Sequence, residues 1–129
     1  MKKYTIELTE EQLRLISDCL EDVSRFASGQ VEMRHTTQEM LRGLPFREQI
    51  DRKTKSEEYL KEVKKTLLPE LGENESLSYN GTNFIGNIYQ IYRTILYKLA
   101  TDNNWNNVYS SPPLPSGNMG EVKITKIEE

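Results

Sequence analysis

The segment from Phe84 to Ala100 constrains the fold most, because its apolar residues recur at the three- and four-residue spacing of an α-helix. At ~100° per residue they cover about half of the helix circumference. A helix with so wide an apolar face has to be covered by other elements. We therefore predict a central helix over residues 82–100. The apolar residues are Phe84, Ile85, Ile88, Ile91, Tyr92, Ile95, Leu96 and Leu99.

A second helix is predicted over residues 10–28. Thr9 and Gln12 have the spacing of a capping box, in which the hydroxyl and the amide satisfy backbone N–H groups of the first turn. Gly29 is a natural end, because a helix often closes with a left-handed residue. One stripe of this helix is apolar and consists of Leu13, Ile16, Leu20, Val23 and Ala27. The polar residues that we expect to face away from it are Arg14, Asp18, Glu21 and Arg25.

Two further capping boxes predict the remaining helices. Thr36 with Glu39 indicates a short helix over residues 37–42, and Thr54 with Glu57 indicates a helix over residues 55–68. Pro69 ends the longer of the two, because proline lacks the backbone donor that a continuing helix requires.

Both ends of the chain alternate polar and apolar residues, the pattern of a half-buried strand. Tyr4, Ile6 and Leu8 share one face of a strand over residues 3–8, and Val122 and Ile124 do so in a strand over residues 121–127. We therefore predict one mostly helical α+β domain over residues 1–129. In it, three to four helices pack on a small antiparallel sheet that pairs the N- and C-terminal strands.

Composition narrows the class of protein. Acidic residues outnumber basic ones, 20 against 17, which disfavours binding to duplex nucleic acid. Cys19 is the only cysteine, so one chain can form neither a disulfide nor a cysteine metal site, which fits a reducing cytoplasm. No apolar run reaches the roughly 18 residues of a membrane span. These features predict a cytoplasmic protein that is not embedded in a membrane.

Catalytic motifs are scarce. The chain has one histidine and lacks the HExxH, GxSxG, P-loop and GxGxxG patterns. A lone histidine such as His35 is more often a surface or core-rim residue than a general base. An acid–base pair among the many carboxylates stays open, although accidental pairs are commoner. The inventory favours a binding protein without a metal or cofactor over an enzyme.

The most suggestive feature lies on the predicted central helix, where Gly86, Tyr89, Arg93 and Tyr97 follow one edge of the apolar face. Tyrosine rings beside a guanidinium can stack on a planar ligand and clamp its phosphate or carboxylate. Gly86 would allow a close approach to the backbone. The alternative is ordinary packing, in which an arginine folds over aromatic rings at the core boundary.

Two polar residues near the end of the first helix are weaker candidates. Arg25 follows Glu21 by four residues, which is the favourable order for a surface ion pair. Gln30 comes directly after Gly29, where an amide can reach a ligand or another element, although an exposed loop glutamine is the commoner case.

A proline-rich loop is predicted over residues 101–120. Pro112 and Pro115 have the PxxP spacing that favours polyproline II and can dock in an aromatic groove. Trp105, the only tryptophan, is a candidate anchor for the loop or for a partner. The alternative is that the prolines only stiffen a long connection.

The order of short landmarks along the chain resembles a family of small uncharacterised proteins encoded by tailed bacteriophages and prophages. The landmarks are LTEEQ, a helix ending in SGQ, LPEL, IYQIYR, a proline-rich loop and a final VKI. The chain departs from the family pattern after Arg93, where it reads TILYKLA instead of a shorter basic segment. The residues that the resemblance carries over are Arg25, Gly29, Gln30, Pro69, Glu70, Leu71, Tyr89, Gln90 and Arg93.

The resemblance implies a phage accessory protein that acts by binding in the infected bacterial cytoplasm. One hypothesis is that it sequesters a small anionic, nucleotide-like ligand of host defence signalling, with Arg93 as the anion clamp and Tyr89 as the stacking ring. Gln30 and Arg25 would be secondary contacts. The alternative is a protein–protein module that inhibits a host protein through the loop 103–117. Homo-oligomerisation suits both hypotheses.

Overall fold

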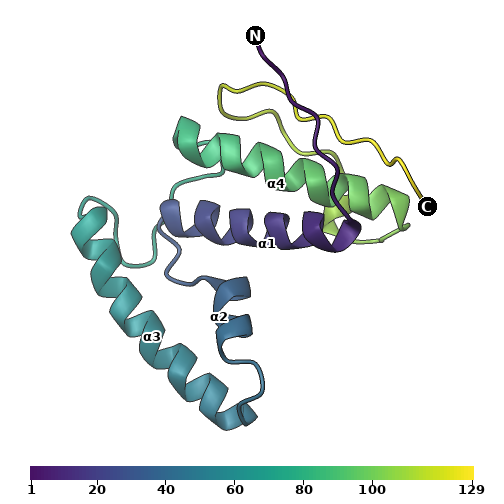
Figure 1. Cartoon of the computed structure of the whole chain (residues 1–129). Helices are drawn as coiled ribbons and strands as arrows, with labels where there is room; N and C mark the ends of the chain where they lie inside the picture. Colours follow the sequence, from purple (N-terminus) through teal and green to yellow (C-terminus); the bar gives the residue numbers. More distant parts are fainter.

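The computed structural model describes residues 1–129 and contains four α-helices and one short 3-10 helix (Figure 1). The helices are α1 (Glu10–Ala27), α2 (Arg34–Met40), α3 (Phe46–Leu67), α4 (Asn83–Asp102) and η1 (Val108–Ser110). The main helix pair is α1 with α4. The two run antiparallel, because Asn103 after α4 donates to Glu10 at 2.7 Å, and the N–H of Leu77 before α4 donates to Ser28 O at 2.7 Å.

The predicted α+β fold is wrong, because the chain forms no β-sheet and both terminal segments lie extended without a strand partner. Tyr4 and Ile6 are 85% and 73% exposed, so the apolar side chains of residues 3–8 are not buried against the rest of the chain as the alternating pattern predicts. The segment 121–127 is likewise unpaired. A two-stranded ribbon alone is only marginally stable in water, and no third strand is present to extend it.

The helix α1 starts at the Thr9–Gln12 capping box, which forms as the sequence predicts. Its orientation differs from the expectation. The polar residues Ser17, Glu21 and Ser24 are buried, whereas Ile16 and Val23 of the apolar stripe are 36% and 37% exposed. The hydroxyl of Ser17 donates to Tyr92 O of α4 at 3.4 Å, so small side chains let the two helices approach closely.

The helix α2 begins at Arg34 and has no side-chain cap of its own. The expected capping box of Thr36 with Glu39 is wrong, because the Thr36 hydroxyl donates to Asp22 of α1 at 2.7 Å instead. The carboxylate of Asp22 also accepts from the N–H groups of His35 and Thr36, at 3.1 and 2.7 Å. A residue of one helix therefore caps another.

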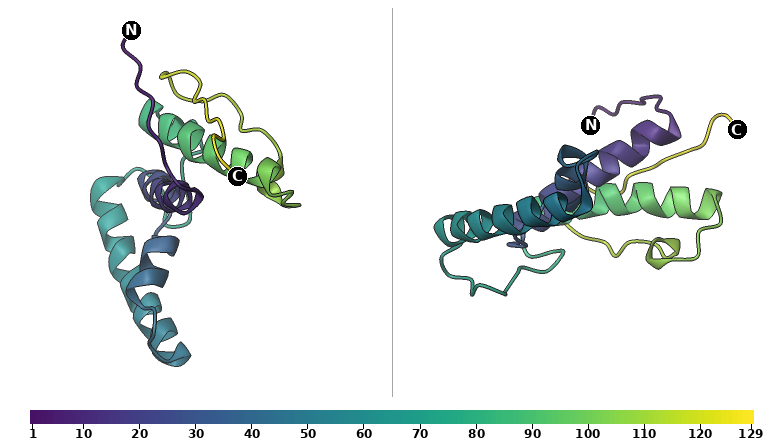
Figure 2. Two further views of the ribbon diagram at one scale, coloured as in Figure 1. Left: turned by 45° about the vertical axis from the view of Figure 1, so that its right-hand side comes forward. Right: turned by 90° about the horizontal axis from the view of Figure 1, so that it is seen from below.

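The helix α3 begins at Phe46, nine residues before the predicted start, with Pro45 as its N-cap residue. The expected capping box of Thr54 with Glu57 is wrong, because both residues lie inside the helix. It extends away from the α1–α4 pair (Figures 1 and 2). Lys64 ties its end to the rest of the chain: its ammonium donates to Glu73 O at 2.9 Å and Glu75 O at 2.5 Å. The Lys64 stem lies against Gly29, which has a φ of +100°.

The C-terminal segment is fastened to α4. Gly86 has no side chain to hold Gly117 away, and a Cβ at position 86 would lie 2.5 Å from Gly117 N. The hydroxyl of Ser116 donates to Gly86 O at 2.7 Å. The amide oxygen of Asn87 accepts from the N–H groups of Asn118 and Met119 at 2.8 and 3.0 Å. This part of the proline-rich loop is thus held by a close backbone approach and by hydrogen bonds between side chains and backbone.

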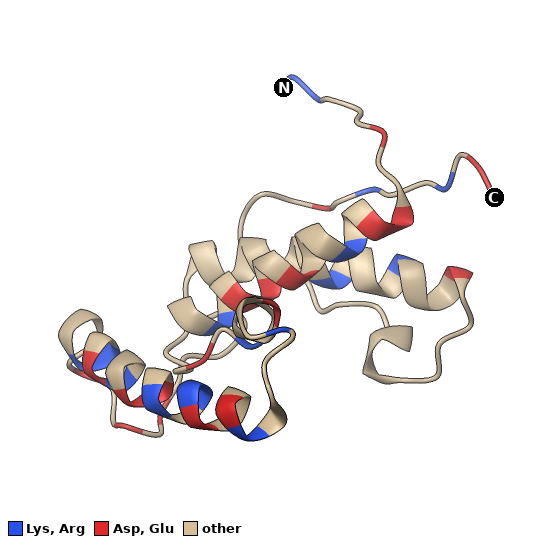
Figure 3. Ribbon diagram, turned by 60° about the horizontal axis from the view of Figure 1, so that its bottom comes forward, with Lys and Arg blue, Asp and Glu red and all other residues tan.

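Charged side chains are distributed unevenly. Lysine, arginine, aspartate and glutamate surround α3, whereas α4 carries only Arg93, Lys98 and Asp102 (Figure 3). None of the helices is long and apolar enough to cross a membrane.

Candidate functional site

A hollow of about 310 Å³ lies on one side of the α1–α4 pair. The first helix contributes polar residues to its wall, α2 contributes His35, α4 contributes Leu96, and the loop before and within η1 supplies aromatic residues. The lining residues are Arg14, Asp18, Glu21, His35, Leu96, Trp105, Asn107 and Tyr109. Three planar rings and both signs of charge therefore meet at one place.

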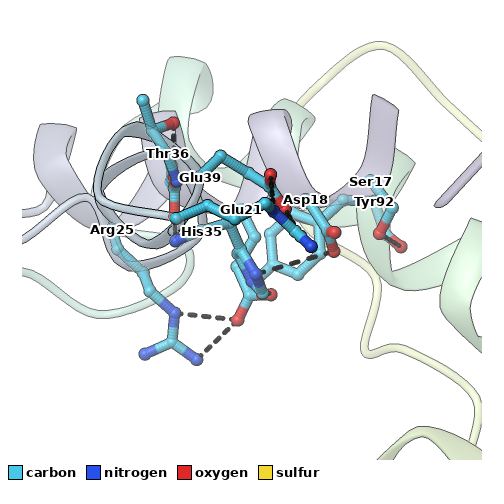
Figure 4. Close-up of polar contacts among 10 residues, drawn as sticks. Ser17, Asp18, Glu21, Arg25, His35, Thr36, Glu39 and Tyr92 are labelled. Carbon is cyan, nitrogen blue, oxygen red and sulfur yellow. Dashed lines mark hydrogen bonds and ion pairs between the residues drawn. The ribbon is translucent and has the colours of Figure 1, made fainter. Parts of the chain in front are cut away.

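A buried hydrogen-bond network joins α1 and α2 beside the hollow, and two of its members, Glu21 and His35, also line the hollow (Figure 4). Glu21, only 5% exposed, accepts from Arg25 Nε at 2.9 Å and lies 3.0 Å from His35 Nε2. The neighbouring Asp22, 1% exposed, accepts three bonds from the start of α2. These contacts offset the cost of burying two adjacent carboxylates and fix His35 at the edge of the hollow.

Two arginines hold the aromatic residues of the loop. The guanidinium of Arg14 lies over the Trp105 ring at 4.9 Å, and that of Arg93 lies 5.2 Å from the Tyr109 ring. Arg93 Nη2 also donates to Val108 O at 3.4 Å and to Ser111 O at 3.2 Å. Its Nη1 is buried and has no hydrogen-bond partner. A buried guanidinium N–H without an acceptor is an unsatisfied donor, which is uncommon in a folded protein.

The phenol of Tyr109 lies near one carboxylate and three guanidinium groups. Burial and the negative charge of Glu21 raise the pKa of the Tyr109 phenol, while Arg25, Arg93 and Arg34 are close enough to act in the opposite direction. Arg25 is partly buried, which disfavours its charge, but Glu21 more than compensates and raises its pKa. Charges of both signs therefore act on Tyr109, and two carboxylates, Asp18 and Glu21, line the same hollow.

Tyr92 gives a pH-dependent prediction. Burial, together with the charge of Glu21, raises its pKa to about 12, compared with ~10 in an unfolded chain. The folded state therefore favours the neutral phenol, and this contribution is complete below pH ~10 and lost as the pH approaches ~12. We expect the free energy of unfolding to fall by about 2 kcal/mol across that interval.

Urea denaturation at a series of alkaline pH values measures this loss in the wild type and in Tyr92→Phe. The variant should lose clearly less stability over the same interval, because it has no phenol at this position to ionise. Equal losses in the two proteins would show that other groups cause the decline.

The structure brings some predicted site residues together. Arg25 Nη1 donates to Gln30 Oε1 at 3.2 Å, so these two share a surface, but the Arg25–Glu21 pair is half-buried instead of the simple surface pair that was expected. Tyr89 lies on the same helix as Arg93, where its ring packs 4.7 Å from Tyr79 and 5.8 Å from Tyr92.

The other predicted residues are placed differently. The close approach that Gly86 permits is made by the chain's own Gly117. Tyr97 is half-buried, and Pro112 and Pro115 are exposed. Trp105 lines the hollow beneath Arg14, which is consistent with an anchor for the loop.

Sequence reasoning missed several residues of the hollow: Arg14, Asp18, Glu21, His35 and Tyr109. Four of them were placed on the solvent side of α1 or in an irregular surface segment. One signal could have identified the buried face of the first helix: the small residues Ser17, Ser24 and Ser28 recur on one side of it. Small side chains are suited to close helix packing. Nothing local indicates His35, because its partners come from another helix.

Comparison with protein-family models, with curated proteins and with solved structures finds no match to this chain. The resemblance to phage-encoded proteins therefore stays a prediction.

Proposed function

We propose that this protein binds a small anionic ligand with a planar ring, a nucleotide-like molecule, and does so without catalysing a reaction. The observation that carries the proposal is the guanidinium of Arg93, which lies 5.2 Å from the ring of Tyr109 and has at Nη1 a donor without an acceptor. Arg25 and Arg34 are near enough to act on the same phenol. Arginine is suited to phosphate and carboxylate because its planar donors can bind two oxygens at once.

The adjoining hollow supports a site for the ring of the ligand. Trp105, Tyr109 and His35 line it, and stacking on aromatic side chains is how proteins commonly hold a base. Tyr109 both lines the hollow and lies beside Arg93. A ligand with its ring against Tyr109 would therefore bring its anionic group toward Arg93.

The resemblance to phage proteins suggests a source for such a ligand, a nucleotide signal of a bacterial host. A protein that sequesters it would act in the host cytoplasm, where the lone exposed thiol of Cys19 would stay reduced.

Calorimetric titration with three probes tests the proposal. ADP carries both a ring and an anion, pyrophosphate carries only the anion, and adenosine carries only the ring. We expect ADP to bind at least ~10-fold more tightly than either fragment, since one lost charged contact costs about 1.5–3 kcal/mol. Arg93→Ala should weaken ADP binding by at least ~10-fold for the same reason.

Arg42→Ala is the matched control, because Arg42 is an exposed arginine of the loop after α2, 72% exposed and paired with Glu39. It removes the same charge without touching the site, so ADP affinity should be unchanged. If Arg42→Ala and Arg93→Ala weakened ADP binding equally, the binding would reflect net charge alone and the proposed site would be wrong.

A second candidate is binding of a host protein through the loop 103–117. Pro112 and Pro115 are exposed and Leu114 is 56% exposed, so the outer part of the loop is accessible to an aromatic groove. If this second function is correct, we expect the double variant Pro112→Ala/Pro115→Ala to lose capture of a host protein and to bind ADP as the wild type does.

A further inference from the structure

The α1–α4 pair has a second side, opposite the hollow, that is apolar and open. Helical phase places the predicted stripe of α1 there, including Ile16 and Val23, which are 36% and 37% exposed. From α4 the same side receives Phe84, 60% exposed, and the half-buried Ile88 and Ile91. We define these five residues as the apolar face. None of the five is charged, and on α4 the same helical phase continues to the Lys98–Asp102 ion pair, at 3.0 Å.

The total surface of the chain shows that a large area lacks a cover. The accessible surface is 9713 Å² for a 15.0-kDa chain. A folded monomer of that mass exposes roughly 7,000 Å². The excess of about 2,700 Å² exceeds the ~800 Å² that one partner contributes to an interface of standard size. The excess includes the surface of α3 and of the terminal segments, which extend from the α1–α4 pair (Figure 1), and the apolar face contributes part of it.

We propose that the apolar face is the interface of a homodimer, in which the same face of a second copy of this chain covers it. A face without charges offers no electrostatic complement to a particular foreign partner, whereas it is complementary to itself about a two-fold axis. Two antiparallel helices from each copy then form a four-helix layer, which is a standard way to bury such stripes.

The N-terminal segment supports this assignment. Both terminal segments extend from the α1–α4 pair on the side away from α3 (Figures 1 and 2). Tyr4 and Ile6 are 85% and 73% exposed, although they belong to a segment with the pattern of a half-buried strand, whereas Val122 and Ile124 of the C-terminal segment are half-buried within the single chain. A second copy supplies the surface that the N-terminal pattern requires and that the single chain lacks.

Sedimentation equilibrium of the full chain at micromolar concentrations tests the dimer. We expect the wild type to have twice the mass of the 15.0-kDa chain. Ile16→Lys combined with Val23→Lys would bury two unpaired charges in the interface, so its mass should halve, and Phe84→Lys on the other helix should behave likewise. Circular dichroism verifies that each variant keeps its helical content.

Leu15→Lys is the control, because Leu15 is on the same helix and 64% exposed but points away from the apolar face. It should keep the dimer mass. A wild type with the mass of one chain overturns the proposal. So does a Leu15→Lys variant that dissociates as fully as Ile16→Lys with Val23→Lys, or a folded Phe84→Lys variant that stays dimeric.

Discussion

Replacing Asp22 by alanine is expected to lower the free energy of unfolding by about 3 kcal/mol, because several hydrogen bonds to a buried charged group are lost together. The carboxylate is 1% exposed and accepts from His35 N, Thr36 N and Thr36 Oγ1 at 3.1, 2.7 and 2.7 Å. The first turn of α2 has no other side-chain cap. Urea denaturation followed by circular dichroism measures the loss.

Asp18→Ala is the matched control. Asp18 lies one turn earlier on α1 and its side chain is 43% exposed, with only a 3.8 Å contact to His35. Its removal should change stability by at most about 0.5 kcal/mol, as for an exposed ion pair. If Asp22→Ala were no more destabilising than Asp18→Ala, α2 would not depend on a cap from α1.

The second large effect is expected for Gly86→Ala. The new methyl group would lie 2.5 Å from Gly117 N and 3.0 Å from Gly117 Cα, so the segment 116–119 has to move off α4. It would lose the bonds from Ser116 to Gly86 O and from Asn118 and Met119 to Asn87. The net destabilisation should be about 2 kcal/mol, because alanine returns ~1 kcal/mol of helix propensity against those losses.

Hydrogen exchange at the amides of Asn118 and Met119 reports the release directly, and we expect both to lose their protection in Gly86→Ala. Ser116→Ala is the control, since it removes one hydrogen bond without a clash and should cost about 1 kcal/mol or less. A Gly86→Ala protein that is more stable than the wild type, as an unobstructed helix would be, contradicts the contact.

Local sequence signals predicted where most of the helices lie, but they did not predict which face of each helix is buried. The capping box at Thr9 is local chemistry and forms as expected. Periodicity identifies two faces on α1 but does not say which one α4 covers, and α4 covers the face with Ser17 and Glu21. The predicted strands failed because an alternating pattern requires a partner strand, which the single chain does not supply.

Local signals likewise predicted only part of the candidate site. Helical spacing places Tyr89 and Arg93 on one edge of α4, and this depends only on neighbours in the sequence. Arg93 contacts the carbonyl oxygens of Val108 and Ser111, which no side-chain pattern reveals. His35 looked like an incidental residue because its partner Glu21 belongs to another helix.

Native mass spectrometry tests the central claim, ligand binding at Arg93, most directly. The protein is incubated with a small-molecule extract of bacteria and exchanged into a volatile buffer, alongside Arg93→Ala and Arg42→Ala. We predict that the wild type and Arg42→Ala retain an adduct with the mass of a phosphorylated planar molecule, and that Arg93→Ala does not. A wild type without any adduct, or an adduct that Arg93→Ala retains equally, would contradict the assignment.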